Sequence, residues 1–166
     1  MTESLLESWG ALKVKDILQF KVKPGSDLLA AIEEAIEKAG VKTGVIVSGL
    51  GALDAAVFRN VKEFTDNFPV VPENRLYLDV KMPLELVSLT GWIAPREEDG
   101  KPEVHAHFSA SMVDGDTVRT FGGHLTHGTT TWIKVVVAIA VVEEGKAIAG
   151  YEPLTKSLDL IMHNQT

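Results

Sequence analysis

The sequence Val104-His105-Ala106-His107-Phe108-Ser109-Ala110-Ser111-Met112 alternates between apolar and polar side chains at every step. Such a two-residue period predicts a β-strand with one buried face and one open face. His105 and His107 then share the open face, with their backbone positions about 7 Å apart. Two imidazole rings at that spacing can converge on a single metal ion.

A third histidine follows the same strand after a predicted turn. Asp114-Gly115 is a signal for a tight hairpin that returns the chain antiparallel. The returning segment ends in Gly122-Gly123-His124, which would bring His124 toward the first two histidines. Three histidines with an open fourth position are typical of a catalytic zinc site. The predicted metal ligands are therefore His105, His107 and His124, and the predicted cofactor is zinc or another divalent transition metal.

Other interpretations of these histidines stay open at this point. A His-X-His pair can also be two half-buried strand residues whose ring nitrogens bond to a neighbouring carbonyl or serine oxygen. His127 is either a fourth ligand or a loop histidine near the site, and His163 falls in a polar tail that is expected to be unstructured. The metal assignment depends on whether the two predicted strands bring their histidines together.

Length, composition and charge indicate one globular domain. The 166 residues are 45% hydrophobic and 23% charged, which is ordinary for a chain that buries a core. The absence of cysteine excludes disulfides, thiolate metal sites and cysteine nucleophiles. We expect no secretory leader and no membrane-spanning segment, and hence a cytoplasmic protein without a membrane partner.

The first part of the chain predicts a strand followed by a helix. Residues 12–22 alternate between apolar side chains and polar ones, many of them lysines, as in a half-exposed antiparallel strand. After Pro24-Gly25, either Ser26 or Asp27 can cap a helix whose apolar stripe continues to about residue 39. Gly40 then supplies a C-terminal stop signal. We therefore expect one principal helix after the first strand.

Strand patterns fill most of the remaining sequence. Residues 44–47 and 54–58 predict two strands, joined at 48–53 by a tight turn or by a loop whose amides approach a ligand. Further strands are expected at 76–80, 84–94, 104–112, 117–121, 131–142 and, after a hairpin turn at Glu144-Gly145, 146–149, with a last strand or helical turn at 158–162. This order predicts an α+β fold, in which one principal helix packs on a mainly antiparallel sheet or open barrel.

Five motifs resemble the plant-and-prokaryote conserved (PPC) domain, which follows AT-hooks in plant nuclear proteins and stands alone in bacteria and archaea. They are Pro24-Gly25-Ser26-Asp27-Leu28, Ser48-Gly49-Leu50-Gly51-Ala52-Leu53, Leu84-Glu85-Leu86-Val87-Ser88-Leu89-Thr90-Gly91, Val104-His105-Ala106-His107 and Gly122-Gly123-His124-Leu125. The resemblance covers a core of about residues 16–152 in a single domain spanning 1–166, with N- and C-terminal extensions. It implies a homotrimer and metal binding by the three histidines.

The fold implied by the resemblance is similar to that of acetolactate decarboxylase, a zinc enzyme. A stand-alone PPC-domain protein would then be a metal-dependent lyase or a binder of a small oxo or hydroxy acid. Such chemistry needs an acid/base group and a cation for the carboxylate. Glu85, which interrupts an apolar strand, is the acid/base candidate or a strand-start residue paired with a lysine. Arg119 and Arg59 are candidate carboxylate ligands or surface residues.

The alternative function is a DNA-associated regulator without catalysis, because stand-alone members of the family are often described as predicted DNA-binding proteins. Four lysines in the first strand region favour it: Lys13, Lys15, Lys21 and Lys23. Against it, 23 acidic residues outnumber 16 basic ones, giving a net charge of −7, and the Arg-Gly-Arg-Pro AT-hook is absent. DNA is therefore not an expected partner of this chain alone.

The charge balance generates a first prediction. Non-specific DNA affinity comes largely from basic side chains that neutralise phosphates and release counterions, so a gel-shift titration at about 150 mM salt should show no sub-micromolar complex with duplex DNA. If such a complex forms, and weakens when Lys13, Lys15, Lys21 and Lys23 are changed to glutamine, the regulator becomes the better interpretation.

Overall fold

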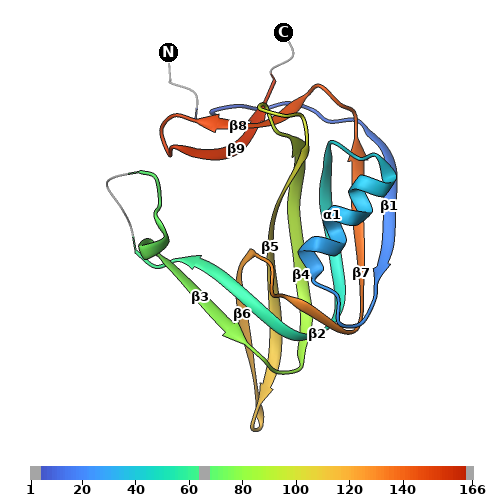
Figure 1. The fold of residues 1–166 in the computed structure, drawn as a ribbon, viewed down its shortest axis with the longest axis vertical. Helices are drawn as coiled ribbons and strands as arrows, with labels where there is room; N and C mark the ends of the chain where they lie inside the picture. Colours follow the sequence, from blue (N-terminus) through green and yellow to red (C-terminus); the bar gives the residue numbers. More distant parts are fainter. Residues whose placement is uncertain (1–4, 64–67, 164–166) are drawn as a thin grey trace.

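The computed structural model describes residues 5–63 and 68–163, and its main feature is a seven-stranded antiparallel sheet with one α-helix against it (Figure 1). The strand order is β1-β7-β2-β4-β5-β6, and β3 is added through its pairing with β2. The elements are β1 (Val14–Val22), α1 (Leu28–Ala39), β2 (Gly44–Val61), the 3-10 turn η1 (Pro72–Asn74), β3 (Arg75–Val80), β4 (Leu84–Pro95), β5 (Pro102–Asp114), β6 (Thr117–Leu125), β7 (Thr130–Val142), β8 (Ala147–Glu152) and β9 (Ser157–Met162).

This architecture confirms the predicted α+β class with a mainly antiparallel sheet. The sheet also curls, because the last part of β2 pairs with β6 as well as with β3. The open barrel stays a prediction, since this second pairing involves only two residue pairs.

The helix begins and ends as its sequence signals predict. The carboxylate of Asp27 accepts a hydrogen bond from the Ala30 backbone N–H at 2.9 Å, and Gly40 adopts the left-handed conformation with φ 65°. Its buried side chains, which pack into the core, are Leu28, Ile32 and Ile36. In the described part of the chain, no helix combines the length and the apolar character needed to cross a bilayer.

The predicted turn at residues 48–53 is wrong, because β2 continues through it as one 18-residue strand. The pairing register with β7 shifts on both sides of this stretch, which marks bulges in place of a reversal. Gly51 has φ +146°, and a Cβ atom there would lie 2.0 Å from the backbone oxygen of Lys134 in β7. The glycine therefore lets two backbones approach closely while the strand bends.

The core confirms the predicted orientation of the histidine strand. Ala106, Phe108 and Ala110 are all buried, and the Phe108 ring stacks on Phe58 of β2 with the ring centroids 4.6 Å apart. Since alternate residues of a strand point to opposite faces, His105 and His107 project away from this core.

The C-terminal hairpin differs from its prediction. Gly145 forms a turn with φ +83°, but β8 pairs with β9 in a separate two-stranded sheet and not with β7 (Figure 1). The strand alternative for residues 158–162 is correct. The hairpin docks on the main sheet through the Glu97 N–H, which donates to the Ala149 carbonyl at 3.0 Å. This contact holds the β8–β9 hairpin where it can line one side of the space beside the histidine strand.

Candidate metal centre

One row of side chains crosses five strands on the face of the sheet that points away from the core. The pairing registers align Tyr77 of β3, Arg59 of β2, His124 of β6, His107 of β5 and Thr90 of β4. Directly paired residues of neighbouring antiparallel strands project from the same face and lie about 5 Å apart. The row therefore places His124 between His107 and Arg59, and His105 lies on β5 two residues before His107.

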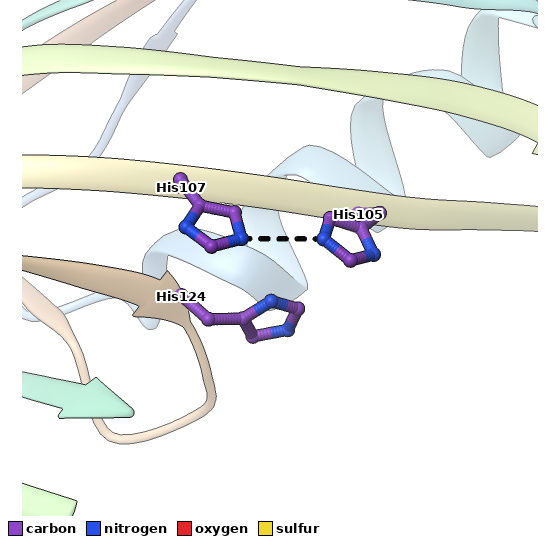
Figure 2. A group of neighbouring side chains, drawn as sticks. All are labelled: His105, His107 and His124. Carbon is purple, nitrogen blue, oxygen red and sulfur yellow. Dashed lines mark hydrogen bonds between the residues drawn. The ribbon is translucent and has the colours of Figure 1, made fainter. Parts of the chain in front are cut away.

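The three predicted ligands meet in one cluster (Figure 2). Their candidate donor nitrogens all lie within 4.8 Å of one another. Nε2 of His105 and Nε2 of His107 are 3.3 Å apart. Two nitrogens bound at about 2.0–2.1 Å to a tetrahedral zinc ion stand roughly 3.3 Å apart, so this pair has the spacing of zinc ligands. The same contact is a hydrogen bond when one of the two Nε2 atoms carries a proton.

The rings of the cluster are held in different orientations. The His124 ring stands nearly perpendicular to the other two, at 85° to His105 and 84° to His107. The Trp92 indole of β4 stacks on the His105 ring with centroids 5.1 Å apart and an interplanar angle of 21°. Trp92 is directly opposite His105 in the β4–β5 ladder, so the strand register itself supplies this support.

All three histidines are kept neutral by their surroundings. Burial is the first cause, and for His124 burial together with the positive charge of Arg59 lowers the pKa to about 3. Burial also lowers the pKa of His105 and of His107, although the nearby Asp159 carboxylate opposes the effect at His105. Neutral imidazole is the form that coordinates a metal, so little proton competition is expected at neutral pH.

A cleft of about 920 Å³ opens over the cluster. On one side of the histidines it is lined by Arg59 of β2 and Arg75 of β3. Its other walls include Trp92, Glu103 and Asp159. The acidic Asp159 comes from β9, far along the sequence from the histidine strand. The arrangement can hold a cation on the histidines and an anionic group beside it.

The structure separates the other predicted site residues. Arg59 lines the cleft, but Glu85 and Arg119 are exposed and lie outside its lining. Glu85 is opposite Ser111 at the far end of the β4–β5 ladder, and the Arg119 Nη2 atom pairs with Asp114 Oδ2 at 2.6 Å. A catalytic role for Glu85 or Arg119 stays a prediction, to which this geometry adds no contact.

The two remaining histidines are not part of the cluster. His127 Nδ1 lies 3.2 Å from the Oδ1 atom of Asp27 at the start of α1, so the fourth-ligand alternative is wrong. His163 follows β9, where its backbone N–H donates to the Lys146 carbonyl at 2.8 Å.

Sequence reasoning missed Arg75, Trp92 and Asp159. The sequence placed Trp92 in a predicted strand, two residues from Thr90. Its stacking on His105 could not be predicted, because the register between the two strands was unknown. No sequence signal pointed to Asp159 or Arg75, because each lies in a short segment whose place beside the histidines follows only from the fold.

A family model for the Plants and Prokaryotes Conserved (PCC) domain matches residues 11–143. The chain belongs to this family. The PCC match confirms the resemblance seen in the sequence motifs, and it ends before β8 and β9, which lie beyond residue 143. No curated protein matches the chain.

Several solved structures share the fold of this PCC domain. A metal-containing protein from Archaeoglobus fulgidus is 22% identical with a TM-score of 0.71, and the alignment covers 91% of this chain and 96% of that one. A plant- and prokaryote-conserved protein from Pyrococcus horikoshii is 23% identical with a TM-score of 0.71, covering 95% and 99%. A protein from Ralstonia eutropha JMP134, whose name proposes that it binds DNA, is 20% identical with a TM-score of 0.66, covering 87% and 90%.

The lowered histidine pKa values predict a pH dependence of the metal-free protein. Unfolded histidines take up protons below their ordinary pKa near 6.5, whereas the folded cluster resists protonation, so the free energy of unfolding should fall as the pH drops from about 7 to about 4. Each histidine can contribute at most about 1.4 kcal/mol per pH unit to that slope. Urea unfolding in the presence of a chelator measures it.

The matched variants are His124→Asn and His163→Asn. The first should flatten the slope because it removes the histidine with the pKa of about 3, and the second, on the exposed residue after β9, should not. An identical slope in the parent protein and His124→Asn would contradict the prediction.

Proposed function

We propose that this PCC domain binds one divalent transition metal ion through His105, His107 and His124, and that the ion is zinc. The 3.3 Å separation of two Nε2 atoms and the neutral state of the rings support the proposal. Imidazole ligands suit zinc, although nickel, copper and iron accept them as well. A relative of the same fold is described as a metal-containing protein.

We further propose that the cleft binds a small oxo or hydroxy acid, with its carboxylate on Arg59. The observation that carries this is the position of the Arg59 guanidinium, which adjoins His124 in the row and forms no ion pair with any acidic residue of the described chain. Tyr77 is the residue directly opposite Arg59 in β3, on the same face of the sheet. An acid held there would place its oxo or hydroxyl oxygen toward the histidines.

The reaction class that fits these parts is that of a metal-dependent lyase. A bound divalent ion supplies a Lewis acid that polarises an oxygen of the bound acid. Arg59 orients the carboxylate, and the Trp92 indole covers one side of the His105 ring. Asp159 lines the same cleft and lies close enough to act on the His105 pKa, which makes it a better placed proton carrier than Glu85.

Metal content and ligand binding test the proposal together. Protein purified without a histidine tag should contain near one ion per chain by elemental analysis. Changing any one of the three histidines to asparagine should lower zinc affinity by more than about 100-fold. The loss of a residue that only hydrogen-bonds to a metal ligand typically costs roughly 10- to 100-fold, and the loss of a ligand itself should cost more. The control His127→Asn should keep full metal content, because His127 contacts Asp27 instead.

Binding of a small acid is tested with 2-hydroxybutyrate as the probe. It should raise the melting temperature of the zinc-loaded protein and should not raise that of Arg59→Gln. A folded protein that takes up no added zinc would contradict the metal site, and equal stabilisation of the parent and Arg59→Gln would contradict the role of Arg59.

We also propose that the domain forms a homotrimer, as the family resemblance implies. The physical support is an exposed apolar group on β2 and β4 that comprises Val45, Val47, Leu50 and Val87. Val45 is opposite Trp92, which in turn is opposite His105, so this group adjoins the metal centre. Exposed apolar patches of this kind mark contact surfaces. Light scattering coupled to size exclusion should give three times the mass of the chain, and a monomer mass at micromolar concentration would contradict it.

A DNA-associated regulator remains the alternative, and the exposed lysines of β1 are compatible with it. In the described chain β1 pairs with β7 alone and is an edge strand, and its Lys15 and Lys21 side chains are exposed. Lysines on an edge strand also prevent pairing with another sheet, so their exposure fits either function. The gel-shift titration described above separates the two.

A further inference from the structure

We propose that the acid bound in this cleft carries a second anionic group, a carboxylate or a phosphate, and that Arg75 binds it. This inference rests on the proposed function, which assigns the first carboxylate to Arg59. The starting observation is that the cleft is lined by two guanidinium groups, whereas one carboxylate requires only one of them.

The β2–β3 register places these two arginines side by side. Arg59 is opposite Tyr77, and Arg75 is opposite Val61, so the arginines are diagonal neighbours on the same face of the ladder. Diagonal neighbours of an antiparallel pair lie about 7–8 Å apart at the backbone. Arg59 adjoins His124 in the row, and Arg75 is one step further from the metal centre. A short ligand could thus reach the metal centre, Arg59 and Arg75 in that order.

The Arg75 guanidinium is held by an uncharged partner, because its Nη2 atom donates to the Val70 carbonyl oxygen at 3.1 Å. Arg59 is directly opposite Tyr77 of β3. Arg75, like Arg59, forms no ion pair with any acidic residue of the described chain. The Val70 carbonyl positions the Arg75 guanidinium without neutralising it, and no carboxylate among the described residues lies within ion-pair distance of either arginine, so both can bind anions.

The electrostatic cost of this arrangement is visible in the side chains nearby. Burial and then the charge of Arg75 lower the pKa of Arg59. Two partly buried like charges repel each other, and bound anions would remove that repulsion. One anionic group neutralises only the guanidinium that it contacts. A ligand with two anionic groups can neutralise both guanidinium groups.

The acidic residues of the cleft lie at its other end. Asp159 belongs to β9, and Glu103 of β5 is already near Arg96, whose Nη1 atom is 3.7 Å from Glu103 Oε2. Both arginines of the lining therefore lie on β2 and β3 and its acidic side chains on β5 and β9, where the β8–β9 turn also contributes Lys156. Because Lys156 belongs to the same hairpin as Asp159, Arg59 and Arg75 are the pair of cations toward which two anionic groups of one ligand are directed.

The test compares three probes that share one 2-hydroxy acid core and differ only at the distal end. 2-Hydroxybutyrate ends in a methyl group, malate ends in a carboxylate, and glycerate 3-phosphate ends in a phosphate. Calorimetric titration of the zinc-loaded protein should show that malate or glycerate 3-phosphate binds roughly 10- to 100-fold more tightly than 2-hydroxybutyrate. The tighter of the two identifies the distal group.

Arg75→Gln should remove this advantage, so that malate and glycerate 3-phosphate bind no more tightly than 2-hydroxybutyrate does. Arg75→Lys, which keeps the charge but not the planar fork, should retain part of it. The control Lys81→Gln makes the same change of charge at an exposed residue paired with Asp79, outside the cleft, and should alter nothing. Circular dichroism and a melting curve establish that each variant is folded.

Two outcomes would overturn the inference while leaving the proposed function intact. In the first, all three probes bind equally and Arg75→Gln changes none of them. In the second, Arg75→Gln weakens 2-hydroxybutyrate as much as the other probes, because both arginines then hold one carboxylate. Failure of every probe to bind the zinc-loaded protein would overturn the inference and the small-acid proposal together.

Discussion

The close approach of β2 and β7 at Gly51 is the constraint on which the rest of the structure depends. Because no side chain separates Gly51 from the Lys134 carbonyl, β2 can bend and continue where a turn would otherwise divide it. Its first half then pairs with β7 and β4, and its second half with β3 and β6. The same strand thus joins the helix-covered part of the sheet to the row that carries Arg59 and His124.

The chemistry of the centre follows from what surrounds the three imidazoles. A core of apolar residues lies behind the histidine strand, Trp92 covers His105, and Arg59 adds positive charge beside His124. Burial and positive charge both disfavour the imidazolium form, so the rings remain neutral donors. Arg59 and Arg75 thus line the cleft from β2 and β3, and the β8–β9 hairpin contributes both Asp159 and Lys156 to another wall.

The cleft combines two parts of the chain with different relations to the family. The histidines, Arg59 and Arg75 all fall inside the segment that matches the PCC domain, residues 11–143. The wall that carries Asp159 belongs to the β8–β9 hairpin, which lies after that segment and docks on the main sheet near Glu97. No backbone pairing joins β9 to the histidine strand in the described chain, so the two parts of the cleft belong to separate sheets.

The sequence by itself determined the local elements and the direction of their side chains. The alternation in residues 104–112 was enough to assign Phe108 to the core and both histidines to the open face, because strand geometry fixes which residues share a face. The cap signals at Ser26 or Asp27 and at Gly40 predicted the ends of α1 for an equally local reason, and the structure selected Asp27. Only the tertiary structure decided that β2 passes Gly51 without turning, that Arg59 lines the cleft while Arg119 does not, and that Asp159 faces the histidines. These outcomes depend on strand register and on pairing between distant segments, which arise from packing across the whole sheet and leave no periodic signal in any one stretch.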